Sequence, residues 1–168
     1  MKLVRAIVGI CFAASAVLFT YLISSQPVQA TGGVWYVASN GNDSNNCASP
    51  ATPCATINGA LNVPTFYPGD TVMVAGGIYT DNGSEVVTLN NNVRLLGGWD
   101  AGFSAQAGYS TIDGQNARRG ITVYGLVNAS IDHFIIQHSS ADQGAGIYNN
   151  GLLTITYSTV QNNVASSG

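Results

Sequence analysis

The sequence predicts an all-β protein made of stacked coils of chain, a β-solenoid, with one short helix near its N-terminus. Three observations support this fold class: the composition, the spacing of short apolar runs, and an internal repeat. Charged residues make up 8% of the chain, against about 25% in typical globular domains. Valine, isoleucine, threonine and tyrosine nevertheless recur at short intervals, which is unlike disordered chains and typical of strands.

The internal repeat has a period of 24 residues. A shift by one period superposes Gly120 on Gly144, Tyr124 on Tyr148, Ile131 on Ile155, Gln137 on Gln161 and Ala141 on Ala165. A β-sandwich or barrel requires no such period, whereas each period of a solenoid forms one coil. Stacked coils lie about 4.8 Å apart and place like residues over like. We therefore expect Ile131 over Ile155, and Ile136 over Val160, in the interior.

The elements follow in order along the chain. "VWYV" from Val34 predicts a strand, and the spacing of Ile57, Ala60 and Leu61 predicts a helix over 55–62 with one apolar face. "TVMVA" at 71–75 predicts a second strand. Short strands separated by glycine and asparagine continue from there, so 70–168 is expected to form about four coils. The helix is expected to cap the first coil, because open sheet edges invite aggregation.

The first thirty residues predict an export signal. A cationic start, "MKLVR", precedes the apolar run 6–23, and "VQA" ends in Ala30. This is the layout of a secretory signal peptide cleaved after Ala30. An uncleaved membrane anchor stays open as the alternative, because 18 apolar residues can just span a bilayer. Both interpretations place the rest of the chain outside the cytoplasm, with 31–69 holding the first strand and the cap helix.

Export determines how the cysteines are interpreted. Cleavage removes Cys11 and leaves Cys47 and Cys54 in "NNCASPATPCAT". In an oxidising compartment this pair predicts one local disulfide. A metal site and two free thiols remain as alternatives, although no second Cys or His pair lies nearby in the sequence.

The charge balance bears on the class of partner. After residue 30 the chain carries three arginines against eight carboxylates, a net charge of −5, and no lysine. A basic face for nucleic acid or anionic lipid is therefore not expected. A membrane is expected to be involved only through the signal segment or an anchor that follows residue 168.

The sequence resembles a known group of proteins. "WYVASNGNDSNNCASPATPCATINGAL" and "PGDTVMVAGGIYT" resemble the N-terminal segment of secreted right-handed parallel β-helix proteins, the pectate-lyase-like superfamily. "GAGIYNNGLLTITYSTVQNN" resembles the repeats of polymorphic outer-membrane proteins. The resemblance implies a secreted or surface-displayed right-handed parallel β-helix. Gly168 falls where a third repeat would begin, so we expect the chain to be the N-terminal part of a longer protein.

The resemblance makes polysaccharide lyase or glycoside hydrolase the enzymatic hypothesis, with the active-site coils expected mostly beyond residue 168. A lyase needs a base and a cation, often calcium, and the candidates are Arg118 and Arg119 with Asp113 nearby. A hydrolase needs two converging carboxyl groups, for which the candidates are Asp113 and Asp132. We interpret both arginines as solvated turn residues, and His133 and His138 as surface or stacking residues. No obligatory metal or cofactor is expected; calcium enters only with the lyase hypothesis.

Binding is the function class we favour. The loop "GGWDAGFSAQAGYS" contains Trp99, Phe103 and Tyr109, and loops on a rigid scaffold commonly carry recognition. Aromatic rings on a nearly uncharged surface suit an extracellular carbohydrate or a cell-surface protein of a host or neighbouring cell. The alternative is that Trp99 simply packs against the side of a coil. The sequence thus predicts a non-catalytic, adhesin-like scaffold.

Overall fold

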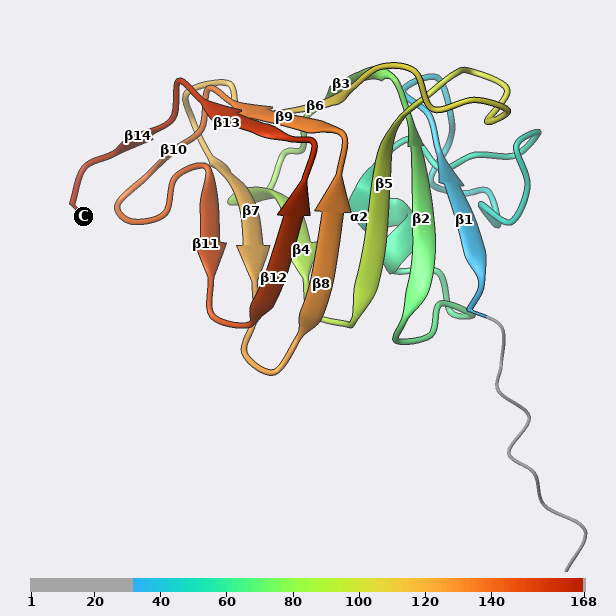
Figure 1. The fold of residues 1–168 in the computed structure, drawn as a ribbon, viewed down its shortest axis with the longest axis horizontal. Coiled ribbons are helices and arrows are strands. Elements are labelled where there is room, and N and C mark those ends of the chain that lie inside the picture. Colours follow the sequence, from blue (N-terminus) through green and yellow to red (C-terminus); the bar gives the residue numbers. More distant parts are fainter. Residues whose placement is uncertain (1–31, 168) are drawn as a thin grey trace, which may run out of the picture. The chain divides into compact units, whose positions relative to one another are not determined.

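The computed structural model describes residues 32–167 and consists almost entirely of short parallel strands (Figure 1). Its one helix is α2 (Ile57–Leu61). The strands are β1 (Val34–Val37), β2 (Asp70–Ala75), β3 (Gly77–Tyr79), β4 (Glu85–Leu89), β5 (Val93–Trp99), β6 (Ser110–Asp113), β7 (Arg119–Val123), β8 (Asn128–Asp132), β9 (Phe134–Gln137), β10 (Ser140–Ala141), β11 (Ile147–Asn149), β12 (Leu152–Thr156), β13 (Thr159–Gln161) and β14 (Val164–Ala165). The expected all-β class is confirmed.

The strands form three main parallel sheets and one small pair. Sheet A has the order β1-β2-β5-β8-β12, sheet B the order β13-β9-β6-β3, and sheet C the order β11-β7-β4, while β10 pairs with β14. From β2 onward the chain visits sheets A, B and C in turn and then returns to A. We call one such passage a circuit; Figure 1 shows the strands of successive circuits side by side.

The register confirms the expected stacking in sheets A and B. Ile155 pairs with Ile131, and Val160 pairs with Ile136, each one period apart. Sheet C departs from the period, because Ile147 pairs with Ile121, a separation of 26 residues. The superposition of Tyr124 on Tyr148 is therefore wrong. The segment between β9 and β11 is longer than that between β6 and β7, and the turn from β11 to β12 is correspondingly shorter than that from β7 to β8.

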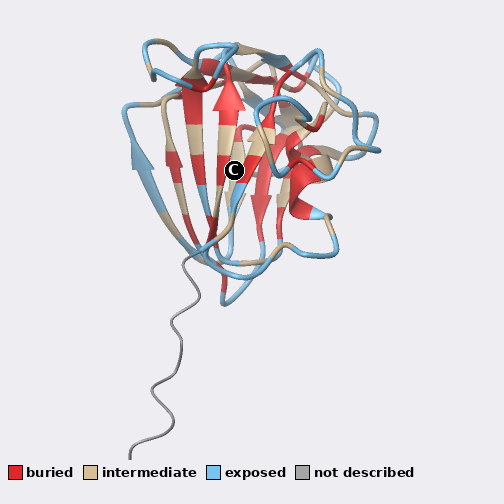
Figure 2. Cartoon of the chain, turned by 90° about the vertical axis from the view of Figure 1, so that its right-hand side faces the viewer, coloured by how far each residue is buried: buried red, intermediate tan, exposed pale blue. Residues whose placement is uncertain are grey.

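The interior is lined by alternate residues of the strands (Figure 2). Fully buried side chains recur at matched positions, among them Val72, Leu95 and Ile131 in sheet A and Ile112 and Ile136 in sheet B. Each buried Ile or Leu contributes roughly 1.5–3 kcal/mol through removal of its apolar surface from water. In the last circuit of the described residues the same positions are more open, and Ile155 is 42% exposed.

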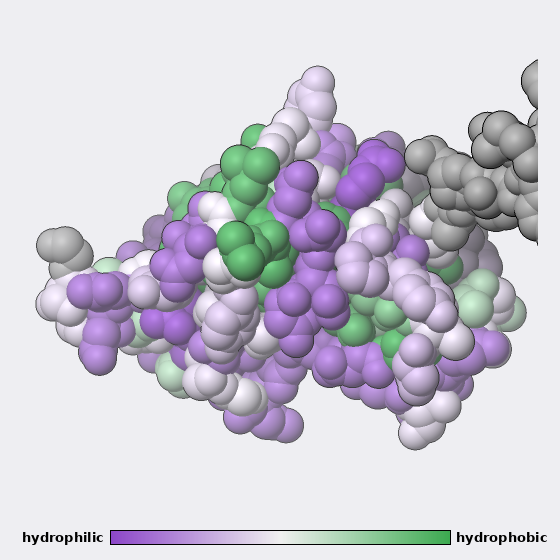
Figure 3. All heavy atoms as spheres, turned by 90° about the horizontal axis from the view of Figure 1, so that it is seen from below, coloured by the Kyte–Doolittle hydropathy of each residue, from purple (hydrophilic) through white to green (hydrophobic). Residues whose placement is uncertain are grey.

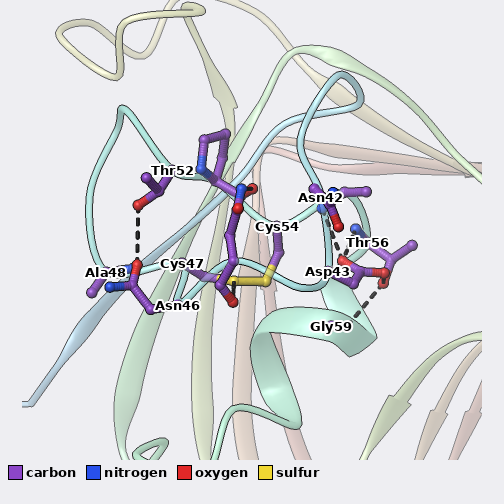
Figure 4. Close-up of a disulfide and its surroundings, with 12 residues drawn as sticks. Asn42, Asp43, Asn46, Cys47, Ala48, Thr52, Cys54, Thr56 and Gly59 are labelled. Carbon is purple, nitrogen blue, oxygen red and sulfur yellow. Dashed lines mark hydrogen bonds between the residues drawn. A yellow bond between two sulfur atoms is a disulfide. The ribbon is translucent and has the colours of Figure 1, made fainter.

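Helix α2 packs against β1, β2 and β4, next to the disulfide (Figure 4). Thr56 is its N-cap and accepts a hydrogen bond from the Gly59 N–H. Asp43 accepts bonds from the backbone N–H groups of Ala55 and Thr56, which holds this segment outside the helix. The helix is therefore shorter than the predicted 55–62. Its apolar face is buried as expected, with Ile57 2% exposed.

The predicted disulfide joins Cys47 to Cys54, and both residues are fully buried. It closes a loop whose backbone covers the outer edge of β1. The Tyr36 N–H donates to the Cys47 carbonyl at 2.8 Å, and the Cys54 N–H donates to the Tyr36 carbonyl at 2.9 Å. The loop thus satisfies backbone groups that an edge strand would otherwise leave open.

The predicted signal peptide, 1–30, lies outside the described residues. In the part of the chain that is described, no helix has the length and apolar character needed to cross a bilayer.

Candidate functional site

Three rings stack at the corner between sheets A and B, and we call them the aromatic column: Tyr109, His133 and Tyr157. They are spaced by one 24-residue period each. The ring centroids lie 5.8 Å apart between Tyr109 and His133, and 5.2 Å apart between His133 and Tyr157, with 32° between the planes in both pairs. Stacking of like positions in successive circuits therefore produces a continuous strip of rings.

The backbone of the corner fixes where these rings lie. A single residue, His133, joins β8 to β9, and it turns the chain with φ 59°. Tyr157 occupies the same position one circuit later with φ 44°. Left-handed backbone is costly for residues with a side chain, so neighbouring contacts must hold it. The Ser110 N–H donates to the His133 carbonyl, and the His133 N–H donates to the Thr156 carbonyl.

A carboxylate, Asp132, lies beside the column and is held by three side chains, which leaves part of its acceptor capacity open. The Oδ2 of Asp132 lies 2.6 Å from His133 Nδ1 and accepts a bond from Gln106 Nε2 at 3.1 Å, while its Oδ1 accepts from the Thr156 hydroxyl at 2.6 Å. Burial raises the pKa of Asp132, but the bonds from Thr156, His133 and Gln106 outweigh it and leave that pKa below its ordinary value. Asp132 is therefore ionised at neutral pH.

The column is open to solvent along one side. Tyr109 is 50% exposed and Tyr157 is 75% exposed. Exposed ring surface therefore lies next to the polar atoms of Gln106, Asp132 and Thr156. Such a pairing of an apolar platform with hydrogen-bonding groups can hold a ligand that has both an apolar face and hydroxyl groups.

The other two predicted binding residues lie apart from the column. Phe103 is only 8% exposed and packs edge-on against Tyr36, with the ring centroids 5.0 Å apart. Trp99 is half-buried and packs against the same small cluster, which also contains Ala38 and Ala75. The predicted aromatic loop therefore divides: Trp99 and Phe103 attach it to the outer face of β1 and β2, and Tyr109 alone joins the exposed strip.

A second Asp–His pair lies at the corner that follows sheet B. Asp113 Oδ2 lies 2.9 Å from His138 Nδ1 and accepts from Gln137 Nε2 at 3.1 Å. Burial raises the pKa of Asp113, but bonds from His138, the Gln115 N–H and Gln137 outweigh it and hold that pKa below its ordinary value. No ring stacks on His138 in the described residues.

The structure separates the two candidate catalytic arginines. Arg118 donates to the Gln115 side chain at 2.7 Å, close to Asp113. Arg119 forms an ion pair with Glu85 at 3.2 Å and lies over the Tyr148 ring, 4.9 Å from its centroid. Arg119 is thus held in place on sheet C by Glu85 and Tyr148. The two arginine side chains have different partners and do not come together as the base of a lyase.

The two candidate hydrolase carboxylates lie beside opposite ends of strand β9: Asp132 ends β8 and is separated from β9 by one residue, and Asp113 ends β6, opposite Gln137. The four steps of backbone from His133 to Gln137 span about 13 Å of extended chain, beyond the ~5–9.5 Å that glycoside hydrolysis uses. That reaction also needs a carboxylic acid with a raised pKa, whereas Asp113 and Asp132 both have lowered ones. This geometry does not fit an acid–base pair.

Within 32–167, no three side chains of His, Cys, Asp or Glu gather closely enough to hold a metal ion. Comparison with known proteins finds no matching family, no similar curated protein and no similar solved structure.

Tyr109 was predicted as a binding residue and His133 as a surface or stacking residue, but the two were not joined into one site. The signal was present, because Tyr109, His133 and Tyr157 are spaced by the same period that aligns the strands. The role of Gln106 could not be predicted from the sequence, because only the folded loop brings it to Asp132, 26 residues away.

Proposed function

We propose that the chain is a right-handed parallel β-helix of an exported protein and that it binds carbohydrate through the aromatic column. Successive circuits through three parallel sheets, a stacked interior and a covered first edge support the β-helix assignment. The disulfide supports an extracytoplasmic location, because such bonds persist in oxidising compartments. The resemblance of the repeats to those of surface-displayed β-helix proteins agrees with both.

The observation that carries the binding proposal is the exposed strip of Tyr109, His133 and Tyr157 beside engaged polar groups. Sugar rings present C–H faces that pack on aromatic surface and hydroxyls that suit Asp132 and Gln106. A specific protein partner would need about 800 Å² of surface on each side, and three rings supply only part of that. Carbohydrate is therefore the ligand class we favour over a cell-surface protein.

The scaffold is proposed to be non-catalytic. Asp113 and Asp132 lie beside opposite ends of β9 and both have lowered pKa values, and Arg119 is engaged by Glu85. The alternative, a polysaccharide lyase or hydrolase, would have to place its reacting groups elsewhere than on these candidates.

The test is a glycan array probed with the full chain and with Tyr157→Ala. We expect binding to a subset of extracellular glycans that Tyr157→Ala weakens at least tenfold, taking as a guide the roughly 1–3 kcal/mol that stacking of a nucleobase on one aromatic ring is worth. Tyr67→Ala is the matched control, because Tyr67 is similarly exposed, at 69%, and lies outside the column.

Unchanged glycan binding by a folded Tyr157→Ala variant would exclude the column as the site. Binding to a cell-surface protein but to no glycan would overturn carbohydrate as the ligand class and support a protein partner. Release of unsaturated or shortened sugars from pectin or alginate, with or without calcium, would overturn the non-catalytic assignment.

A further inference from the structure

The outer face of sheet A has a hollow at the end where its strands begin. It has a volume of about 250 Å³ and is lined by Gly69, Asn92, Val93, Arg94, Asn128 and Ser130. These residues lie in the turns that enter β2, β5 and β8 and at the start of the strands. Ligand pockets for drug-sized molecules range from about 300 to 1,000 Å³, so the hollow is suited to one small chemical group.

Arg94 supplies the charge of this hollow. It lies on the outward face of β5 and is exposed. Within residues 32–167, Arg119 forms an ion pair with Glu85, whereas Arg94 forms no ion pair. Arg94 thus presents a guanidinium without an acidic partner, in a chain segment whose net charge is negative.

The carboxylates on the strands that neighbour β5 in sheet A are occupied elsewhere. Asp70 is 3% exposed and accepts bonds from the Gly33 N–H, the Trp35 indole and the Tyr67 N–H. Asp132 is held at the far end of β8 by the column. Neither carboxylate competes for Arg94.

Neutral hydrogen-bonding groups surround the guanidinium. Arg94 pairs in register with Thr71 on one side and Ser130 on the other, and Ser130 pairs with Thr154. The Asn92 side-chain oxygen accepts a bond from the Asn128 N–H at 2.8 Å, which leaves its NH₂ group to donate. Seen from below, the end of the molecule where these turns lie is mostly hydrophilic, with separate hydrophobic areas (Figure 3).

We infer that this hollow is a binding site for an oxyanionic group, a carboxylate or a sulfate, carried by a hydroxylated ligand. The planar guanidinium matches such groups through two parallel N–H···O bonds. The hydroxyls and amides around it donate to the remaining oxygens. The site does not depend on the aromatic column, although both lie along sheet A.

The test is an NMR titration of the ¹⁵N-labelled chain at constant ionic strength with sodium sulfate, sodium glucuronate and, as the neutral control, glucose. We expect saturable shifts of the Arg94, Asn128 and Ser130 signals with at least one anion and none with glucose. Arg94→Gln is expected to weaken this binding at least tenfold, because a charge-assisted pair is replaced by a neutral one.

Arg118→Gln is the matched control and should bind as the wild type does, since Arg118 is also partly exposed but lies at another corner. Tyr157→Ala should keep anion binding even if it loses glycan binding, which separates this inference from the proposed function. Saturation by sulfate alone or by glucuronate alone would identify the oxyanion. Shifts that do not saturate, or that persist in Arg94→Gln, would overturn the site.

Discussion

The two ends of strand β9 carry the same pair of side chains in different settings. At one end Asp132 holds His133, and at the other Asp113 holds His138. Both histidines have left-handed backbone, with φ 59° and 50°. Only His133 lies between two tyrosine rings, and its side chain is 27% exposed against 42% for His138. The comparison shows that the rings of neighbouring circuits, rather than the Asp–His pair itself, convert a polar corner into an aromatic surface.

The largest expected effect comes from removing the core side chain beside the ringed corner. Phe134 follows His133, is fully buried, and belongs to the main core. Phe134→Ala should lower the free energy of unfolding by about 3–5 kcal/mol through lost burial and a cavity. Urea unfolding monitored by circular dichroism measures it. Leu126→Ala, at a fully exposed position, should stay within about 0.5 kcal/mol of wild type; equal effects would refute the assignment of the core.

Acidification should weaken both corners together. Because hydrogen bonds keep the folded-state pKa of Asp113 and Asp132 below the unfolded value, their stabilisation is complete above about pH 4. It is lost as the pH falls through the folded-state pKa values. The urea concentration at the unfolding midpoint, measured from pH 6 downward, should therefore decrease as the pH drops below about 4. The double variant Asp113→Asn, Asp132→Asn should show a flatter dependence, and an unchanged slope would contradict it.

The contribution of the rings can be isolated by a matched pair of variants. His133→Ala and His138→Ala each remove a bond to aspartate and place alanine in left-handed backbone. His133→Ala additionally removes two ring contacts, each worth about 0.5–1.5 kcal/mol. It should therefore be the more destabilising by about 1 kcal/mol or more, measured by thermal unfolding. Equal losses would mean that the column adds no stability.

The smallest effect is expected at the corner without rings. Asn162 occupies the position of His138 one circuit later and has φ 53°. Since asparagine tolerates left-handed backbone, His138→Asn should change the stability by no more than about 0.5 kcal/mol. His133→Asn, by contrast, should abolish the column while keeping the turn. Loss of stability beyond 2 kcal/mol in His138→Asn would show that its bond to Asp113 is essential there.

Much of the fold could be predicted because stacking repeats side-chain chemistry at a fixed interval. The 24-residue period gave the partners of Ile131 and Ile136, and the apolar spacing of Ile57 and Leu61 gave the helix. The register of sheet C could not be predicted, because two neighbouring turns change length in compensating ways. The 24-residue shift then matches identical residues that do not pair in the structure: it aligns Tyr148 with Tyr124, whereas Tyr148 pairs with Thr122.

The site was only partly predictable for a related reason. The aromatic loop was visible in the sequence, but whether a ring packs inward or outward depends on contacts made after the loop folds. Phe103 finds Tyr36, from a strand distant in the sequence, while Tyr109 finds His133. Arg94 gave no signal by itself, since its lack of an acidic partner is a property of the folded surface.

The corner between sheets A and B also differs greatly in length from circuit to circuit. One residue joins β8 to β9, whereas residues 100–109 join β5 to β6, and the strands on either side keep their parallel register. A connection that can grow in this way without disturbing the stack is a natural position for grafting. A foreign peptide inserted after Asp132 would be displayed beside the strands while the rigid support beneath it stays intact.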